Sequence, residues 1–388
     1  MTTRPATGAA VLVVLVLLAL VVLAGAALLY GYGVLMPAAP VHLGLAAGAM
    51  PLIFGAMLHF VPVLSRSAAP ARTVQALPLA MLVAGALAFA SFAFPVNPAG
   101  ARDAAAGLGI AGAALLAVWI HRRGARSIGR PHPCLYWYLA AILCLALALS
   151  AVVLMRIWPE HYLALRRFHL HLNTLGFIGI TAIGTLQVLV PTASGRPDPQ
   201  AAQRLRSGLA WVVAGTLLVA VGSAVQVWLV WPGLILWLVP LLRLARAWWN
   251  LYRHEAFRLS GAVPALAAAL CGFVLVLLHG AGHAAGVLSA TGASAAYIAA
   301  FLFPLVTGAA THLLPVWIRP GPQTAWHAAA RARLGYLGAV RALLFLGGGA
   351  ALGLGAAWGL LPALAGWIMF IAQVLRSGPF QGWRRTTA

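Results

Sequence analysis

Long apolar runs separated by short segments rich in Arg, Pro and Gly make up most of the chain. The runs lie near residues 8–30, 42–64, 77–95, 104–120, 135–155, 168–191, 208–228, 232–246, 261–284, 291–315, 336–357 and 359–375. A helix that spans a membrane needs about 20 mostly apolar residues. The pattern therefore predicts an all-α, polytopic membrane protein with about 12 transmembrane helices.

A sequence pattern is repeated among these spans. Spans two, six and ten end with similar residues: Gly55, His59, Pro62 and Arg66; Gly184, Pro191 and Arg196; and Gly308, His312, Pro315 and Arg319. Because the same pattern returns every four spans, we expect three four-helix units with pseudo-threefold symmetry. We expect one integral membrane domain, 1–388, with repeat units at roughly 1–66, 67–196 and 197–319 and a terminal helix pair at 334–376.

Composition excludes two other classes of protein. Of the 388 residues 63% are apolar and 7% charged, which excludes a soluble domain, where about 25% are charged, and a disordered chain. The net charge of +21 comes from arginine alone. These arginines lie between apolar runs, as the positive-inside rule requires, and form no stripe that would bind nucleic acid.

The arginines also predict topology. With the amino terminus inside, only Arg102, Arg156, Arg166 and Arg167 fall outside. We therefore expect a multi-pass protein of the bacterial inner membrane with both termini in the cytoplasm.

Histidine is the main ionisable residue expected within the spans, because all four acidic residues are predicted to lie in loops. Ionisable groups inside a membrane are candidates for function. The predicted topology places five of them in one outer layer: His42, His169, His171, His279 and His283. Neutral imidazole is a common ligand of haem iron and copper. The alternative is a hydrogen-bonded polar cluster or a proton path.

The spacing of these histidines suggests different roles. His169 and His171 are about 200° apart around a helix, so each would bind a different cofactor. His279 and His283 are four residues apart on one face, a spacing that suits a single metal ion. Gly280, Gly282 and Gly286 are close in sequence and would admit a flat macrocycle or another helix.

Other polar residues have simpler interpretations. We expect His59 and His312 to be structural, and His121, His132, His254 and His327 to be solvated among loop arginines; His161, in an outer loop, could take either role. Arg166 and Arg167 precede the His-x-His pair. They either anchor the helix at the lipid interface or pair with haem propionates, since Arg binds carboxylates through two hydrogen bonds.

The stretch His169-Leu-His171, continuing through Gly176 and Gly179 to Leu-Val-Pro191, resembles a known helix. It is similar to the His-x-His helix of subunit I in the haem–copper oxidase superfamily, particularly the C-type oxidases. It also resembles the NnrS family of haem- and copper-containing membrane proteins linked to nitric oxide, whose motif ends in Pro-(x)3-Gly-Arg, as Pro191 to Arg196 does here.

The resemblance implies haem b, one or two per chain, with copper as an additional candidate. His42 would pair with His169 or His171 on a low-spin haem, and His279 and His283 would bind copper or a second haem. The chain has no adjacent His-His pair, and no Lys or carboxylate is expected within a span. Proton pumping is therefore not expected.

Three functions remain open at this stage. The favoured one is redox chemistry or sensing of a small gas such as nitric oxide; if the protein is an enzyme, it is an oxidoreductase of haem–copper oxidase or nitric oxide reductase type. The second is a non-catalytic dihaem cytochrome for electron transfer. The third is a transporter of metal, haem or a lipophilic substrate, with Pro304 as a candidate helix break. The partners expected are membrane lipid, a periplasmic cytochrome or quinol as electron donor, and partner subunits, but no nucleic acid.

Overall fold

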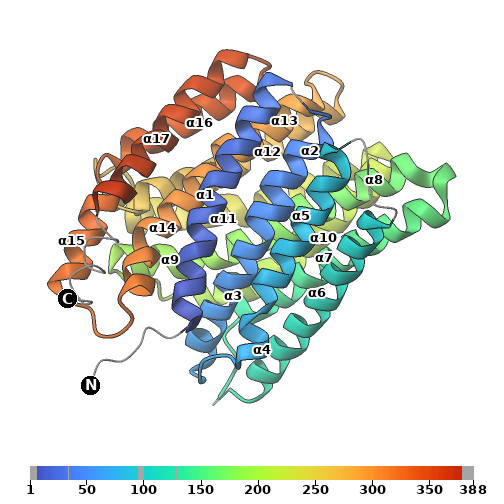
Figure 1. Cartoon of the computed structure of the whole chain (residues 1–388). Helices are drawn as coiled ribbons and strands as arrows, with labels where there is room; N and C mark the ends of the chain where they lie inside the picture. Colours follow the sequence, from blue (N-terminus) through green and yellow to red (C-terminus); the bar gives the residue numbers. More distant parts are fainter. Residues whose placement is uncertain (1–6, 34, 95–99, 128, 378–388) are drawn as a thin grey trace. The chain divides into compact units, whose positions relative to one another are not determined.

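The protein is helical throughout the part of the chain that the structure describes. This computed structural model describes residues 7–33, 35–94, 100–127 and 129–377 (Figure 1). Within these ranges there is no strand, and twelve helices are long and apolar enough to cross a membrane. The prediction of an all-α, polytopic membrane protein with twelve spans is confirmed.

Several spans consist of consecutive helical elements. In chain order the spans are α1 (Thr7–Tyr32); α2 (Ala38–His42), η1 (Leu43–Ala49) and α3 (Met50–Ser65); α4 (Arg72–Gln75) and α5 (Leu77–Ala93); α6 (Ala101–Ala125); α7 (Cys134–Ile157); η2 (Pro159–His161), α8 (Tyr162–His171), η3 (Leu172–Ile180) and α9 (Thr181–Ser194); α10 (Ala201–Ala224); η4 (Val227–Leu229) and α11 (Val230–Ala256); α12 (Val263–Ala284); α13 (Ala290–Ala296), η5 (Tyr297–Leu302) and α14 (Phe303–Ile318); α15 (Ala325–Leu334) and α16 (Gly338–Gly353); and η6 (Ala357–Gly359) and α17 (Leu360–Arg376).

A π-helical segment interrupts each of spans two, six and ten. These segments are η1, η3 and η5. Leu43 and Leu172, the first residues of η1 and η3, stand at the same offset from Gly55 and Gly184 of the sequence repeat. The wider turn therefore recurs in the register that the repeat predicts, and π-helical turns of this kind are frequent at functional sites.

A proline follows two of the three π segments: Pro51 follows η1 and Pro304 follows η5. A proline has no N–H and its ring collides with the carbonyl four residues earlier, which favours a wider turn there. Proline alone does not produce the π turn, because α-helices continue through Pro62, Pro191, Pro240 and Pro315. Pro304, which we considered a candidate break, lies in the first turn of α14 and the helix continues through it. Span six has Ile180 at the corresponding position, so its π segment has no proline there.

Glycines let neighbouring helices approach the π segments closely. A Cβ added to Gly272 of α12 would lie 1.8 Å from the carbonyl oxygen of Ala300 in η5, and one added to Gly85 of α5 would lie 2.1 Å from that of Ala46 in η1. These separations are far below van der Waals contact. Only glycine fits where the backbones of two helices meet so closely.

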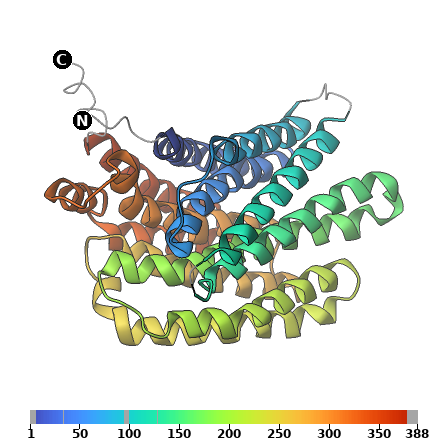
Figure 2. The same cartoon turned by 90° about the horizontal axis from the view of Figure 1, so that it is seen from below.

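Contacts divide the chain into two compact units. Unit 1 contains residues 1–20, 189–197 and 247–388; unit 2 contains residues 21–188 and 198–246. In unit 2, α5 packs on α6 and α6 on α7, side by side in Figures 1 and 2. In unit 1, α12 packs against η5 and α16, and α16 against α17.

Two details of the predicted spans are wrong. Span six begins at Pro159, nine residues before the predicted start at Phe168, because Glu160, Arg166 and Arg167 lower the hydropathy of turns that are nevertheless helical. The prediction that all acidic residues lie in loops also fails, since Asp103 is in the first turn of α6 and Glu255 is near the end of α11.

Replacing Gly272 by Ala tests the close contact between α12 and η5. The added methyl would meet the Ala300 carbonyl, so we expect the free energy of unfolding to fall by about 1–3 kcal/mol. Gly280→Ala is the matched control, because Gly280 is in the same helix and a Cβ there meets nothing within 4 Å. Thermal unfolding in detergent measures both. Equal stability of the two variants would show that this contact is not tight.

Candidate functional site

Two of the predicted histidines lie together in unit 2. The rings of His42 and His169 have centroids 6.3 Å apart and planes inclined by only 16°. His42 is the last residue of α2 and His169 lies in α8, and both side chains are half-buried. The structure therefore pairs His42 with His169, where the sequence left His169 and His171 as alternatives.

Each imidazole of the pair is held through Nδ1. His42 Nδ1 lies 2.7 Å from the carbonyl oxygen of Ala38, one turn earlier, and His169 Nδ1 lies 2.8 Å from that of Ala148 in α7. Because a carbonyl oxygen can only accept, Nδ1 must carry the proton in both rings. A neutral imidazole in this tautomer keeps its lone pair on Nε2, which is the atom a metal binds.

The centroid separation of the pair is close to that of two imidazoles that bind one haem iron. Two imidazoles that bind one iron through Nε2 have centroids roughly 6 Å apart, since each bond from nitrogen to metal is about 2 Å long. A ligating histidine also usually donates its other N–H to a carbonyl, as both rings do here. The Asn173 amide nitrogen lies 3.4 Å from His169 Nε2, a long contact, and has a closer acceptor in the His169 carbonyl at 2.9 Å.

Phe92 and Arg102 extend this pair, and the sequence analysis did not select either for the site. The Phe92 ring stacks on His42, with centroids 4.6 Å apart and planes inclined by 29°. The Arg102 guanidinium carbon lies 4.4 Å from the centroid of the Phe92 ring. The only indication of either residue in the sequence is that Arg102 is one of the few arginines predicted to lie on the outer side of the membrane.

His171 faces a different helix from His169. Its Nδ1 lies 2.8 Å from the Arg167 carbonyl oxygen and 3.0 Å from Ser223 Oγ in α10. His169 bonds to α7 and His171 to α10, as the predicted angle between them requires. Arg167 also donates from Nη1 to the Ser223 carbonyl at 3.4 Å. Arg166 and Arg167 are both exposed.

His279 and His283 belong to unit 1 and have unlike surroundings. His279 is 5% exposed and its Nδ1 is buried without a hydrogen-bond partner. His283 is exposed, with Nδ1 3.1 Å from the Leu288 carbonyl oxygen. Gly353 of α16 lies against the His279 ring, since an added Cβ would come within 2.0 Å of Cε1. Gly280 and Gly286 are two of the glycines predicted to admit a macrocycle or another helix. A Cβ added to Gly280 would meet no atom within 4 Å, and Gly286 has φ +74° in the turn after α12.

Metal-ligating side chains form no larger cluster. No group of three or more His, Cys, Asp or Glu residues in the described ranges could hold a metal ion.

Of the four histidines predicted to be solvated, His327 is buried and His132 is half-buried. His327 is 3% exposed rather than solvated, because its Nδ1 accepts from the Thr324 backbone N–H at 3.0 Å at the start of α15. His121 and His254 are exposed as predicted. His132 is half-buried, and burial, then the charge of Arg206, lowers its pKa below the ordinary value of 6.5, so it is neutral at pH 7.

Comparison with known proteins adds no relative. No family model, no curated protein and no solved structure matches the chain.

Replacing Gly353 by Ala tests whether the His279 ring has a fixed position. The methyl would displace the imidazole, so we expect the free energy of unfolding to fall by about 1–3 kcal/mol. Gly347→Ala in the same helix is the control, because a Cβ there meets no atom within 4 Å. Thermal unfolding compares the two. If G353A were as stable as G347A, the ring would be free to move.

Proposed function

We propose that the protein binds haem b in the membrane, with His42 and His169 as the two axial ligands of one haem. The single observation that carries this proposal is the near-parallel ring pair at 6.3 Å, in which both Nδ1 atoms are bonded to carbonyls. When bound, a haem with two imidazole ligands supplies reversible one-electron transfer.

The chain's own groups prepare this site. The Ala38 and Ala148 carbonyls fix the tautomer of each ring, and Phe92 holds the plane of His42 by stacking. Hydrogen bonds from Nδ1 also make the imidazoles more basic, and this favours the oxidised iron. Arg102 is linked to the pair through Phe92.

His171 supports the reaction with a small gas that the resemblance implies. Its Nδ1 has a carbonyl partner and a hydroxyl partner, Ser223 Oγ of α10, so the ring lies on the side of α10 where a second haem would bind. A haem held by one imidazole keeps an open position for a diatomic ligand such as nitric oxide. We propose redox chemistry or sensing of such a gas as the function, with electrons passing through the His42–His169 site.

The His42–His169 pair itself favours a second candidate function. A site with two imidazole ligands has no open position, so a protein with haem only there would be an electron-transfer cytochrome without catalysis. A periplasmic cytochrome or a quinol would then be its donor or acceptor. Copper stays a proposal that rests on His279 and His283 alone.

Replacing either ligand tests the haem assignment. We expect the purified protein to show a low-spin haem b spectrum and, because the ring planes are near-parallel, a rhombic electron paramagnetic resonance signal. His42→Ala and His169→Ala should each convert that haem to a high-spin form that binds carbon monoxide, or lower the content by about one haem per chain. His121→Ala, at an exposed histidine, is the control.

The same spectra distinguish the gas-binding function from that of an electron-transfer cytochrome. A carbon monoxide shift in the unmodified protein that His171→Ala abolishes supports the gas-binding function. Haem without any shift supports the electron-transfer cytochrome. A protein that contains no haem after purification from haem-replete cells would contradict both.

We also propose the inner-membrane topology in which both termini are cytoplasmic, supported by the Arg distribution and by the even number of spans. A green fluorescent protein fused to the carboxyl terminus should fluoresce and an alkaline phosphatase fused there should be inactive. Phosphatase inserted at Gly355, between spans eleven and twelve, should be active. The reverse pattern would overturn this orientation.

A further inference from the structure

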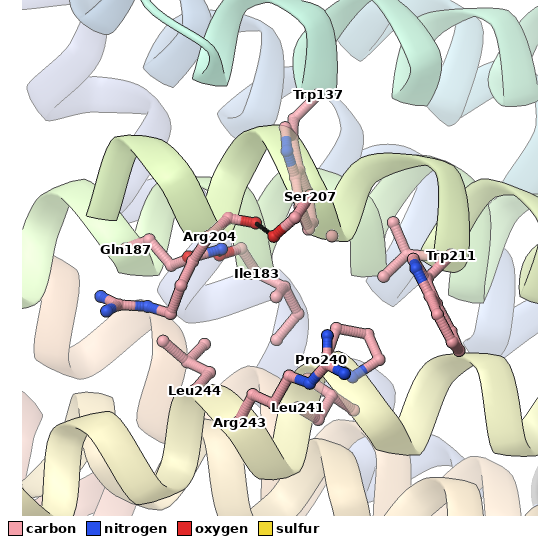
Figure 3. Close-up of a pocket in the computed structure, with 12 residues that line it drawn as sticks. Trp137, Ile183, Gln187, Arg204, Ser207, Trp211, Pro240, Leu241, Arg243 and Leu244 are labelled. Atoms are coloured by element: carbon pink, nitrogen blue, oxygen red, sulfur yellow. Dashed lines mark hydrogen bonds between the residues drawn. The ribbon is translucent and has the colours of Figure 1, made fainter. Parts of the chain in front are cut away.

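A pocket lies in unit 2 at the opposite end of span six from the paired histidines. Residues of helices α7, α9, α10 and α11 line this pocket, and it is partly open to the outside. Figure 3 shows Trp137, Gln187, Arg204, Trp211 and Arg243 around this space. Gln187 is eighteen residues after His169, or about 27 Å along the helix, so the pocket is remote from the candidate haem site.

The pocket holds positive charge that the chain does not fully neutralise. Arg204 pairs with Asp198, whose side chain is only 1% exposed. Arg243 forms no ion pair with any described residue, and its guanidinium carbon lies 5.8 Å from the centroid of the Trp211 ring. One arginine in this pocket therefore keeps its full charge.

The polar atoms around the space are mainly donors. Arg204 Nε is buried and has no hydrogen-bond partner. The side-chain amide of Gln187 donates to the Ile183 carbonyl at 3.3 Å, and Ser207 Oγ donates to the Arg204 carbonyl at 3.3 Å, so both carbonyls are occupied. A buried donor without a partner costs about 1–3 kcal/mol. A ligand that brings acceptor oxygens and negative charge would satisfy both arginines.

The rest of the wall is apolar. Ile183, Val212, Leu241 and Leu244 line the pocket, and the last three of these are contributed by α10 and α11. A ligand that fits must therefore have an anionic head and a hydrocarbon body. Basic pockets between spans on the Arg-rich side of a membrane protein bind anionic lipid headgroups for this reason.

We propose that this pocket binds the phosphodiester headgroup of an anionic phospholipid, with Arg243 as the residue that pairs with the phosphate. A quinol fits less well, because it is neutral and would leave the charge of Arg243 unmatched. The separation of about 27 Å from His169 also argues against a quinol that reduces a haem there. The proposal does not depend on haem binding.

Thermal unfolding of the full chain in detergent, with added short-chain lipid, tests the proposal. Dioctanoyl phosphatidylglycerol should raise the melting temperature, because a ligand of the folded state stabilises it. We expect Arg243→Gln to weaken the apparent affinity by about tenfold, the effect of losing one charged hydrogen-bonded contact. Arg243→Lys keeps the charge but not the planar fork, so its loss should be smaller.

The control is Arg246→Gln: Arg246 is exposed like Arg243 and belongs to the same helix, but it does not line the pocket. We expect it to retain the affinity of the unmodified protein. Dioctanoyl phosphatidylcholine, which carries a phosphate but no net charge, should bind more weakly. Equal losses in R243Q and R246Q would mean non-specific charge attraction and overturn the proposal. Equal protection by inorganic phosphate would mean a site for free phosphate rather than lipid and would also overturn it.

Discussion

The structure depends on one constraint: inside a membrane, every backbone polar group must find its partner within the protein. Pro51 and Pro304 each remove an N–H from a spanning helix, and a π-helical turn rather than a break precedes each of them. The same constraint acts on side chains. His42, His169 and His171 each direct Nδ1 to a helical carbonyl, at 2.7, 2.8 and 2.8 Å. Because those carbonyls can only accept, the backbone itself decides that Nδ1 carries the proton in each neutral ring.

The repeat explains why unit 2 contains this arrangement. His42 and His171 each stand immediately before a π segment, and each bonds to the carbonyl four residues earlier. They are equivalent residues of two repeats. The third repeat has Ala296 before its π segment, and the buried histidine of unit 1, His279, comes from α12 instead. A π segment is therefore present in spans two, six and ten, while a histidine stands immediately before it in two of them.

Periodicity and composition were enough to predict the spans, the repeat and the opposed faces of His169 and His171, because these depend on residues close together in the chain. Which histidine lies beside His42 was not predictable in this way. The His169 ring is held by its hydrogen bond to the Ala148 carbonyl of α7, and a backbone carbonyl cannot be recognised in the sequence. Phe92 was missed because a phenylalanine in an apolar span is indistinguishable from a lipid-facing one. His327 was misjudged because its burial comes from capping Thr324, a local bond that its arginine neighbours conceal.

Both ends of unit 2 have arginines for which the chain has too few acidic partners. The chain has four acidic residues against 25 basic ones, and Asp103, Asp198 and Glu255 already pair with Arg156, Arg204 and Arg196. Almost none of the remaining positive charge can be neutralised from within the protein. Arg102, Arg166, Arg167 and Arg243 are exposed, so the negative charge that balances them can come from other molecules. Lipid phosphates can supply it around Arg243 and the carboxylates of a cofactor around Arg102, Arg166 and Arg167. The scarcity of acidic residues is therefore itself a reason to expect anionic ligands at both ends.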